Sequence, residues 1–150
     1  MIPNPMINKK LAFMAIPVLA AIMIGATVAP SYAGDTITGL VDIKPGSDTN
    51  SINPQSRGVI PVAILGHVFF DVADVNVSTL EFGPAGATPF HPLAFHLEDV
   101  NGDGLNDLVT HYRTQETGIA FGDERACITG ETNGGSGLFG CDDISTVPNP

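Results

Sequence analysis

Glycine and proline recur so often after residue 33 that few windows there are long enough for a regular helix. Between them lie short runs rich in valine, isoleucine, phenylalanine and threonine, which is typical of strands joined by turns. We therefore expect an all-β fold, a single antiparallel β-sandwich of immunoglobulin-like type with about seven or eight strands. The expected strands are Thr36–Lys44, Val59–Leu65, Thr79–Phe82, Leu93–Glu98, Asp107–Thr114, Glu124–Glu131 and Asp142–Val147, with Phe69–Val72 as a weaker eighth. Pro61 lacks an amide hydrogen, which predicts an edge strand or a bulge there.

The first 33 residues have the organisation of a secretory signal. Two lysines precede an apolar run over 11–28, and the small residues Ser31 and Ala33 stand three and one residues before the expected cleavage point. We expect a signal-peptide helix within 1–33 and cleavage after Ala33. A retained membrane anchor is the alternative, because the apolar run is near the lower length limit for a bilayer span.

The expected mature chain comprises one domain over 34–147 and a frayed tail over 148–150. It carries 4 basic and 16 acidic residues, a formal charge of −12. This charge argues against nucleic acid as a partner, since phosphates require clustered lysine and arginine, and against anionic membrane surfaces. We therefore expect a secreted or cell-surface protein whose partner is an extracellular protein or a polysaccharide, with no membrane contact after signal cleavage.

The most specific motif is the stretch 99–108, which reads DVNGDGLNDL. Oxygen-bearing side chains fall at loop positions 1, 3, 5 and 9, namely Asp99, Asn101, Asp103 and Asp107. Gly104 permits a sharp bend, and the main-chain carbonyl of Leu105 supplies a further ligand. Calcium takes about six to eight oxygen ligands, so this spacing predicts a calcium site. Magnesium is the second choice, because it demands stricter octahedral geometry.

An EF-hand is excluded on two counts. Its loop needs a bidentate glutamate at position 12, where this chain has Thr110, and it needs flanking helices, where strands are expected here. The spacing instead resembles the calcium-binding hairpin loops of integrin-type FG-GAP repeats, in which such a loop joins two strands. An ordinary acidic turn is the alternative. A turn needs one or two such residues, however, and a pair of carboxylates about 5 Å apart repels by roughly 3 kcal/mol.

A longer resemblance covers most of 39–147. The stretches that carry it are VDIKPGS (41–47), NSINP (50–54), SRGVIPVAIL (56–65), FGPAGA (82–87) and HYRTQETGI (111–119). They resemble a family of secreted microbial β-modules that occur alone or inside larger surface proteins. The resemblance implies an exported β-domain with a calcium loop and brings no catalytic activity.

Cys127 and Cys141 are the only cysteines, and in an exported chain they predict one disulfide. They lie symmetrically about Gly134. A three-residue hairpin loop at 133–135 would place Thr132 opposite Ser136 and Cys127 opposite Cys141. Two free buried thiols are the alternative.

His96, His111 and Arg113 are candidate ligand contacts. The two histidines lie on the strands that flank the calcium loop, and whether they share a face depends on the register. Imidazole pairs suit zinc or copper, but hydrogen-bonded histidines are the simpler interpretation. The chain lacks a Gly-Xaa-Ser-Xaa-Gly motif, and we expect no enzyme. A calcium-stabilised surface or extracellular structural or binding module is the first hypothesis, and a secreted hydrolase or histidine-based metalloenzyme is the alternative.

Overall fold

The computed structural model describes residues 36–38, 41–91 and 95–148. They all lie in the second of two compact units, Ala33–Pro150. The signal-peptide prediction for 1–33 and the last two tail residues lie outside the described residues. Within the described ranges, no helix is long and apolar enough to cross a membrane.

Ten strands build two larger sheets and one small one over the described residues. One sheet has the order β1 (Thr36–Thr38), β9 (Gly137–Asp143), β8 (Arg125–Thr132) and β5 (Val75–Phe82). The other has the order β2 (Val41–Ile43), β4 (Val59–Ile64), β7 (Asp107–Arg113) and β6 (His96–Glu98). The small sheet pairs β10 (Ser145–Thr146) with β3 (Ser51–Ile52). Two 3₁₀ turns, η1 (Val72–Asp74) and η2 (Thr114–Glu116), complete the elements.

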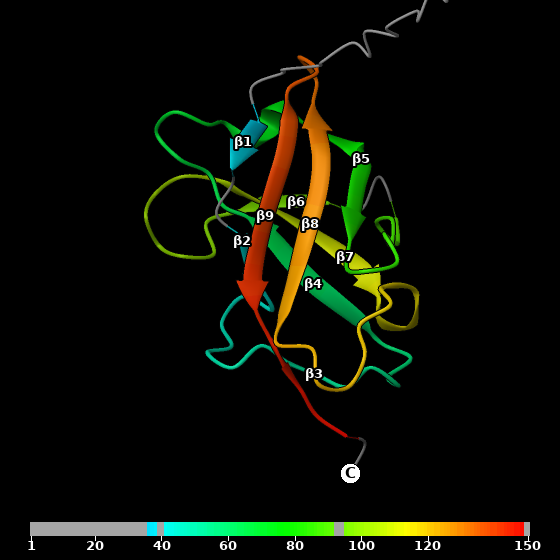
Figure 1. Ribbon diagram of the computed structural model, residues 1–150. Coiled ribbons are helices and arrows are strands. Elements are labelled where there is room, and N and C mark those ends of the chain that lie inside the picture. Colours follow the sequence, from blue (N-terminus) through cyan, green and yellow to red (C-terminus); the bar gives the residue numbers. More distant parts are fainter. Residues whose placement is uncertain (1–35, 39–40, 92–94, 149–150) are drawn as a thin grey trace, which may run out of the picture. The chain divides into compact units, whose positions relative to one another are not determined.

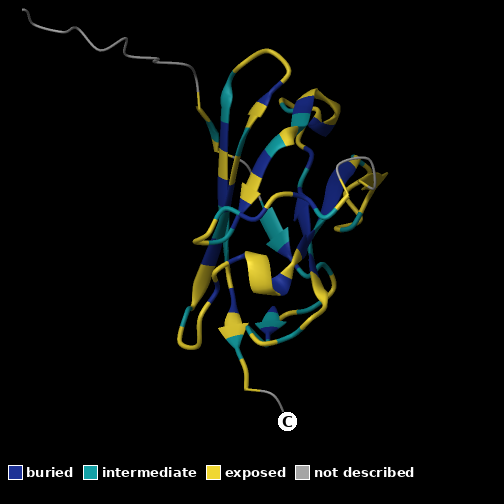
Figure 2. Ribbon diagram, turned by 90° about the vertical axis from the view of Figure 1, so that its right-hand side faces the viewer, coloured by how far each residue is buried: buried dark blue, intermediate teal, exposed yellow. Residues whose placement is uncertain are grey.

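The expected β-sandwich is confirmed. In Figure 1, β8 and β9 cross in front of β4 and β7, and one apolar core lies between the two sheets. Figure 2 shows buried and exposed residues alternating along the strands, as expected when one face of each sheet is packed inward. The core joins side chains from both sheets: Ile43, Val62, Ile64, Leu108 and Tyr112 from one, and Leu80, Phe82, Ile128 and Leu138 from the other.

Several strand bounds differ from the prediction. The expected strand Thr36–Lys44 is split into β1 and β2, and the weak strand at Phe69–Val72 is instead a turn leading into η1. The last expected strand divides into β9, which begins at Gly137, and β10. Two short pairings, β1 with β9 and β10 with β3, are parallel. Strands of two or three residues carry too little sequence pattern to be recognised.

The strand containing Pro61 is not an edge strand, because β4 lies between β2 and β7. The proline is tolerated there for a local reason. Its carbonyl accepts a hydrogen bond from Lys44 N–H at 2.8 Å, which means that Pro61 faces the residue just after β2 ends. Lys44 has a positive φ of 58° and turns the chain away. The missing amide hydrogen therefore falls where the ladder with β2 stops.

Candidate metal centre

The loop 99–106 connects the antiparallel strands β6 and β7, whose last pair is Glu98 opposite Asp107. The flanking elements are strands, as expected. Gly102 and Gly104 have φ values of 78° and 86°, which side chains with a Cβ rarely adopt. These two glycines turn the backbone tightly, so the oxygen-bearing residues between and around them stay close together.

Asp99 organises the start of the loop. Its Oδ1 accepts hydrogen bonds from Gly102 N–H at 2.7 Å and Asp103 N–H at 3.1 Å. Its Oδ2 accepts one from Gly104 N–H at 2.9 Å. Three amide donors thus fix the carboxylate inside the turn. A carboxylate has about four lone-pair sites, so one remains for another partner.

Asn101 and Asp103 hold each other in place and stay exposed to solvent. Asn101 Oδ1 accepts from Asp103 N–H at 2.9 Å, and Asn101 Nδ2 donates to Asp103 Oδ2 at 3.1 Å. Asp103 Oδ1 accepts from Leu105 N–H at 2.8 Å. Each oxygen keeps free lone pairs, and the loop presents an asparagine and two carboxylates in one short, hydrogen-bonded turn.

Asp107 differs from the other acids because its residue is fully buried, with 0% exposure. Its Oδ2 accepts a hydrogen bond from Val100 N–H at 2.9 Å, which closes the loop, and its Oδ1 accepts one from Gly66 N–H at 2.8 Å. A Cβ built on Gly66 would lie 2.2 Å from the carbonyl oxygen of Asn106. Only glycine therefore fits where the two segments touch.

None of the loop acids forms an ion pair with another described residue. The ion pairs among the described residues are His96–Glu98, Arg113–Glu116 and Arg125–Asp143, and none includes Asp99, Asp103 or Asp107. Within the same residues, no three side chains of histidine, cysteine, aspartate or glutamate converge as a ready metal centre. The candidate ligands of the loop also include the side chain of Asn101 and the main-chain carbonyl of Leu105, which are not among these four residue types.

The turn 66–70 lies against this loop and was not recognised from the sequence. His67 N–H donates to Phe70 O at 3.0 Å and Phe70 N–H donates back to His67 O at 2.8 Å. Between them, Val68 and Phe69 are 71% and 91% exposed. A cavity of about 320 Å³ is lined by residues of this turn and by residues 104–106 of the loop. The run Val68-Phe69-Phe70 reads as a strand, and no glycine or asparagine at the turn centre signals the bend.

The register brings His96 and His111 onto one face of the sheet. His96 lies opposite Val109, so His111 is its diagonal neighbour two residues further along β7. The ring centroids are 6.0 Å apart, and His96 Nε2 lies 3.3 Å from Glu98 Oε2. Partial burial lowers the pKa of His111, and the nearby His96 lowers it further. Arg113 lies on the same strand, with its guanidinium 3.9 Å from the centre of the Phe90 ring.

Asp142 joins the two sheets at their edge. Its Oδ2 accepts hydrogen bonds from Ile43 N–H and Asn50 Nδ2, both at 2.9 Å. Asp42 accepts no side-chain hydrogen bond from the described residues. Burial raises the pKa of its carboxyl, and the negative charges of Asp142 and Asp107 raise it further. None of these contacts was expected, because they depend on which strands meet across the sandwich.

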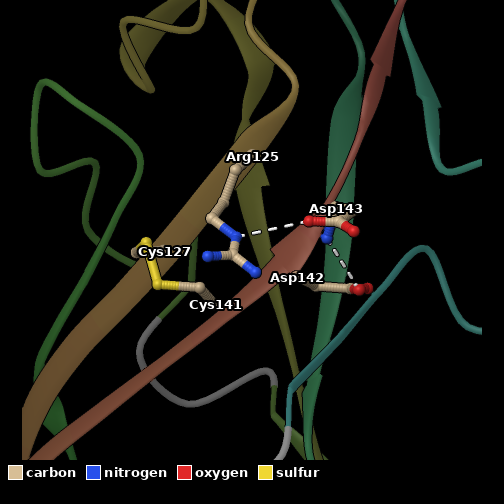
Figure 3. Close-up of a disulfide and its surroundings, with 5 residues drawn as sticks. All are labelled: Arg125, Cys127, Cys141, Asp142 and Asp143. Atoms are coloured by element: carbon tan, nitrogen blue, oxygen red, sulfur yellow. Dashed lines mark hydrogen bonds and ion pairs between the residues drawn. A yellow bond between two sulfur atoms is a disulfide. The ribbon is translucent and has the colours of Figure 1, made fainter.

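The predicted disulfide between Cys127 and Cys141 is confirmed. The two residues are direct partners in the antiparallel pair β8–β9, and Figure 3 shows the bridge spanning the two strands beside Arg125 and Asp143. Thr132 N–H bonds to Ser136 O at 2.8 Å, and Gly135 has a φ of 83°. The three-residue loop and its register are therefore as predicted.

No protein-family model, curated protein or solved structure matches this chain.

Proposed function

We propose that this chain is an exported calcium-binding module of the cell surface or extracellular space, stabilised by calcium and serving a structural or binding role. The observation that carries the proposal is the loop 99–107, in which Asp99, Asn101, Asp103, Asp107 and the Leu105 carbonyl alternate along a tightly turned backbone. The loop acids have no cationic partner among the described residues, and a divalent ion would offset two of their three negative charges.

The amide hydrogen bonds to the loop oxygens support the same proposal. They orient the carboxylates before any ion arrives, so that less ordering is needed on binding. Asp107 anchors the end of the loop in the core, and Asp99 anchors its beginning. Bound calcium would be held by five protein oxygens at most if each ligand contributes one, and water would complete the shell of about six to eight.

Calcium titration by isothermal calorimetry tests the proposal directly. We expect one site, with a dissociation constant on the order of 10⁻⁴–10⁻³ M, as in other extracellular modules. Asp103→Asn removes the negative charge of one ligand at an exposed position and should weaken binding, whereas Asp48→Asn removes the same charge at an exposed position outside the loop. If calcium titrated into the unaltered protein gives no heat of binding, the loop is an ordinary acidic turn and the proposal is wrong.

The resemblance to FG-GAP-type loops and to secreted microbial modules belongs to the same proposal. A secreted hydrolase or a histidine-based metalloenzyme remains the alternative, and the shared face of His96 and His111 is the feature that favours it. Zinc titration of the unaltered protein and of His111→Gln addresses this alternative. Zinc binding that needs His111 would favour it over the calcium module.

A further inference from the structure

A cavity of about 230 Å³ lies at the far end of β7 from the candidate metal centre. It is lined by Arg57, Gly58, Arg113, Gln115 and Glu116. The strand register explains why these residues meet: Val59 pairs with Arg113, and the segments beyond that pair, 57–58 and 115–116, come together. The sequence alone singled out Arg113 but not Arg57.

The cavity concentrates positive charge in a strongly acidic protein. Two of the chain's three arginines line it. Arg57 is exposed and makes no hydrogen bond or ion pair among the described residues. The Arg113 guanidinium is positioned over the Phe90 ring, and its Nε lies 3.8 Å from Glu116 Oε1, too far for a hydrogen bond. Both guanidinium groups therefore retain donors for an anion, and arginine suits a planar carboxylate.

The remaining polar groups restrict what kind of anion fits. Glu116 would repel a second negative charge, but its carboxylate accepts hydrogen bonds from hydroxyl groups. Gln115 Nε2 donates to Gln55 O at 3.4 Å, which leaves its side-chain oxygen as a further acceptor. The volume is below the usual range of about 300–1,000 Å³ for ligand pockets, which suits a single ring whose neighbours extend into solvent.

We propose that this cavity binds one uronic acid residue of an acidic polysaccharide. Arg57 and Arg113 bind the carboxylate, and Gln115 and Glu116 accept hydrogen bonds from ring hydroxyls. This names a ligand for the module proposed above. It does not draw on the calcium loop, which lies roughly 20 Å away along the seven residues of β7. The repulsion from the protein's net negative charge is largely screened beyond about 8 Å at physiological salt.

Trigalacturonate is the probe, titrated into the unaltered protein in the presence of chelator and followed by calorimetry and amide chemical shifts. We expect saturable binding that Arg57→Ala weakens about tenfold, the loss typical of a charged hydrogen bond. Arg57 is exposed and has no partner among the described residues, so this variant should keep the melting temperature. Arg125→Ala is the matched control, since it removes one arginine from β8 and should change the affinity by less than about twofold.

Two further ligands test the chemistry. The methyl ester of trigalacturonate lacks the charge, and tetra-aspartate carries carboxylates without sugar hydroxyls; we expect neither to bind at concentrations that saturate with trigalacturonate. Equal binding of either compound, or equal weakening by Arg57→Ala and Arg125→Ala, would overturn the assignment. The two proposals fail separately. If calcium does not bind, the uronate site is still tested, because these titrations are made in chelator. If calcium binds but trigalacturonate does not, only the uronate site is refuted.

Discussion

Asp107 and Gly66 are 41 residues apart, yet the Asp107 carboxylate accepts a hydrogen bond from the Gly66 amide at 2.8 Å. Because Asp107 also binds Val100 N–H, one buried side chain holds both the loop 99–106 and the turn 66–70. Asp107→Asn would replace one carboxylate oxygen by an NH2 group, which would face the N–H of either Gly66 or Val100 and could not accept its hydrogen bond. We expect it to lower the free energy of unfolding by about 1–3 kcal/mol, measured by urea denaturation in chelator. An unchanged free energy of unfolding would show that these two hydrogen bonds contribute little to stability and would contradict the prediction.

Calcium should stabilise the folded protein. A ligand that binds only the native state adds about 2.7 kcal/mol at a hundredfold excess over its dissociation constant. Millimolar calcium should therefore raise the melting temperature measured by calorimetry, and chelator should lower it. Asp103→Ala should remove most of the response, while Asp48→Ala, exposed and outside the loop, should keep it. Identical melting curves in calcium and in chelator contradict the proposed function.

The disulfide should contribute strongly to stability. The bridge joins residues 14 apart in sequence, and closing a loop of this size is worth about 3 kcal/mol in the chain-entropy model. Replacing Cys127 and Cys141 by serine should lower the denaturation midpoint accordingly. Adding reductant to the unaltered protein should give a similar loss, and reductant should leave the double variant unchanged. A midpoint insensitive to both treatments would mean that the β8–β9 pairing is stable without the bridge.

Asp42→Asn should stabilise the protein at neutral pH. Because the pKa of Asp42 is raised in the folded state, its contribution to stability is present below the unfolded pKa and is lost as pH rises through the folded value. Asparagine removes the partly buried charge and its repulsion from Asp142 and Asp107. The gain in melting temperature should disappear below the usual aspartate pKa of about 3.9. Asp48→Asn, at an exposed site, should show no such pattern.

His111 should make stability depend on mildly acidic pH. The pKa of His111 is lowered in the folded state. Between the folded and unfolded pKa values, the unfolded chain therefore binds a proton at His111 more readily than the folded protein does. Stability is therefore complete above the unfolded pKa of about 6.5 and falls as pH drops through that value to the folded one. His111→Gln should flatten the plot of unfolding free energy against pH in this window. His67→Gln is the control, and an equal flattening there would contradict the assignment to His111.

Local features of this protein could be read from its sequence. The spacing of Cys127 and Cys141 about Gly134 predicts the β8–β9 register, because a hairpin loop sets the pairing of every residue that follows. The loop 99–106 and its flanking strands could be predicted for the same reason. Turn chemistry and residue spacing act over a few residues and need no knowledge of the rest of the fold.

Features that depend on distant pairing could not be predicted. Pro61 is tolerated in a central strand because β2 ends opposite it, and Arg57 meets Arg113 only through the β4–β7 register. The turn at Val68 and Phe69 is closed by hydrogen bonds between His67 and Phe70, and Gly66 just before it bonds to Asp107, 41 residues away. In each case the segment that determines the local structure lies tens of residues away in the sequence. Local strand propensity carries no information about such distant pairing.

The order of strands in the sandwich also determines when the chain can fold. The sheet that contains Leu80 and Phe82, both on β5, has β8 and β9 at its centre, between β1 and β5. These two central strands come from the last part of the sequence. In a chain delivered amino end first, the earlier strands have no second layer to pack against until β8 and β9 emerge. We therefore expect the core to close only after β8 and β9 have emerged, because Leu80 and Phe82 lie in a sheet whose central strands come late in the sequence.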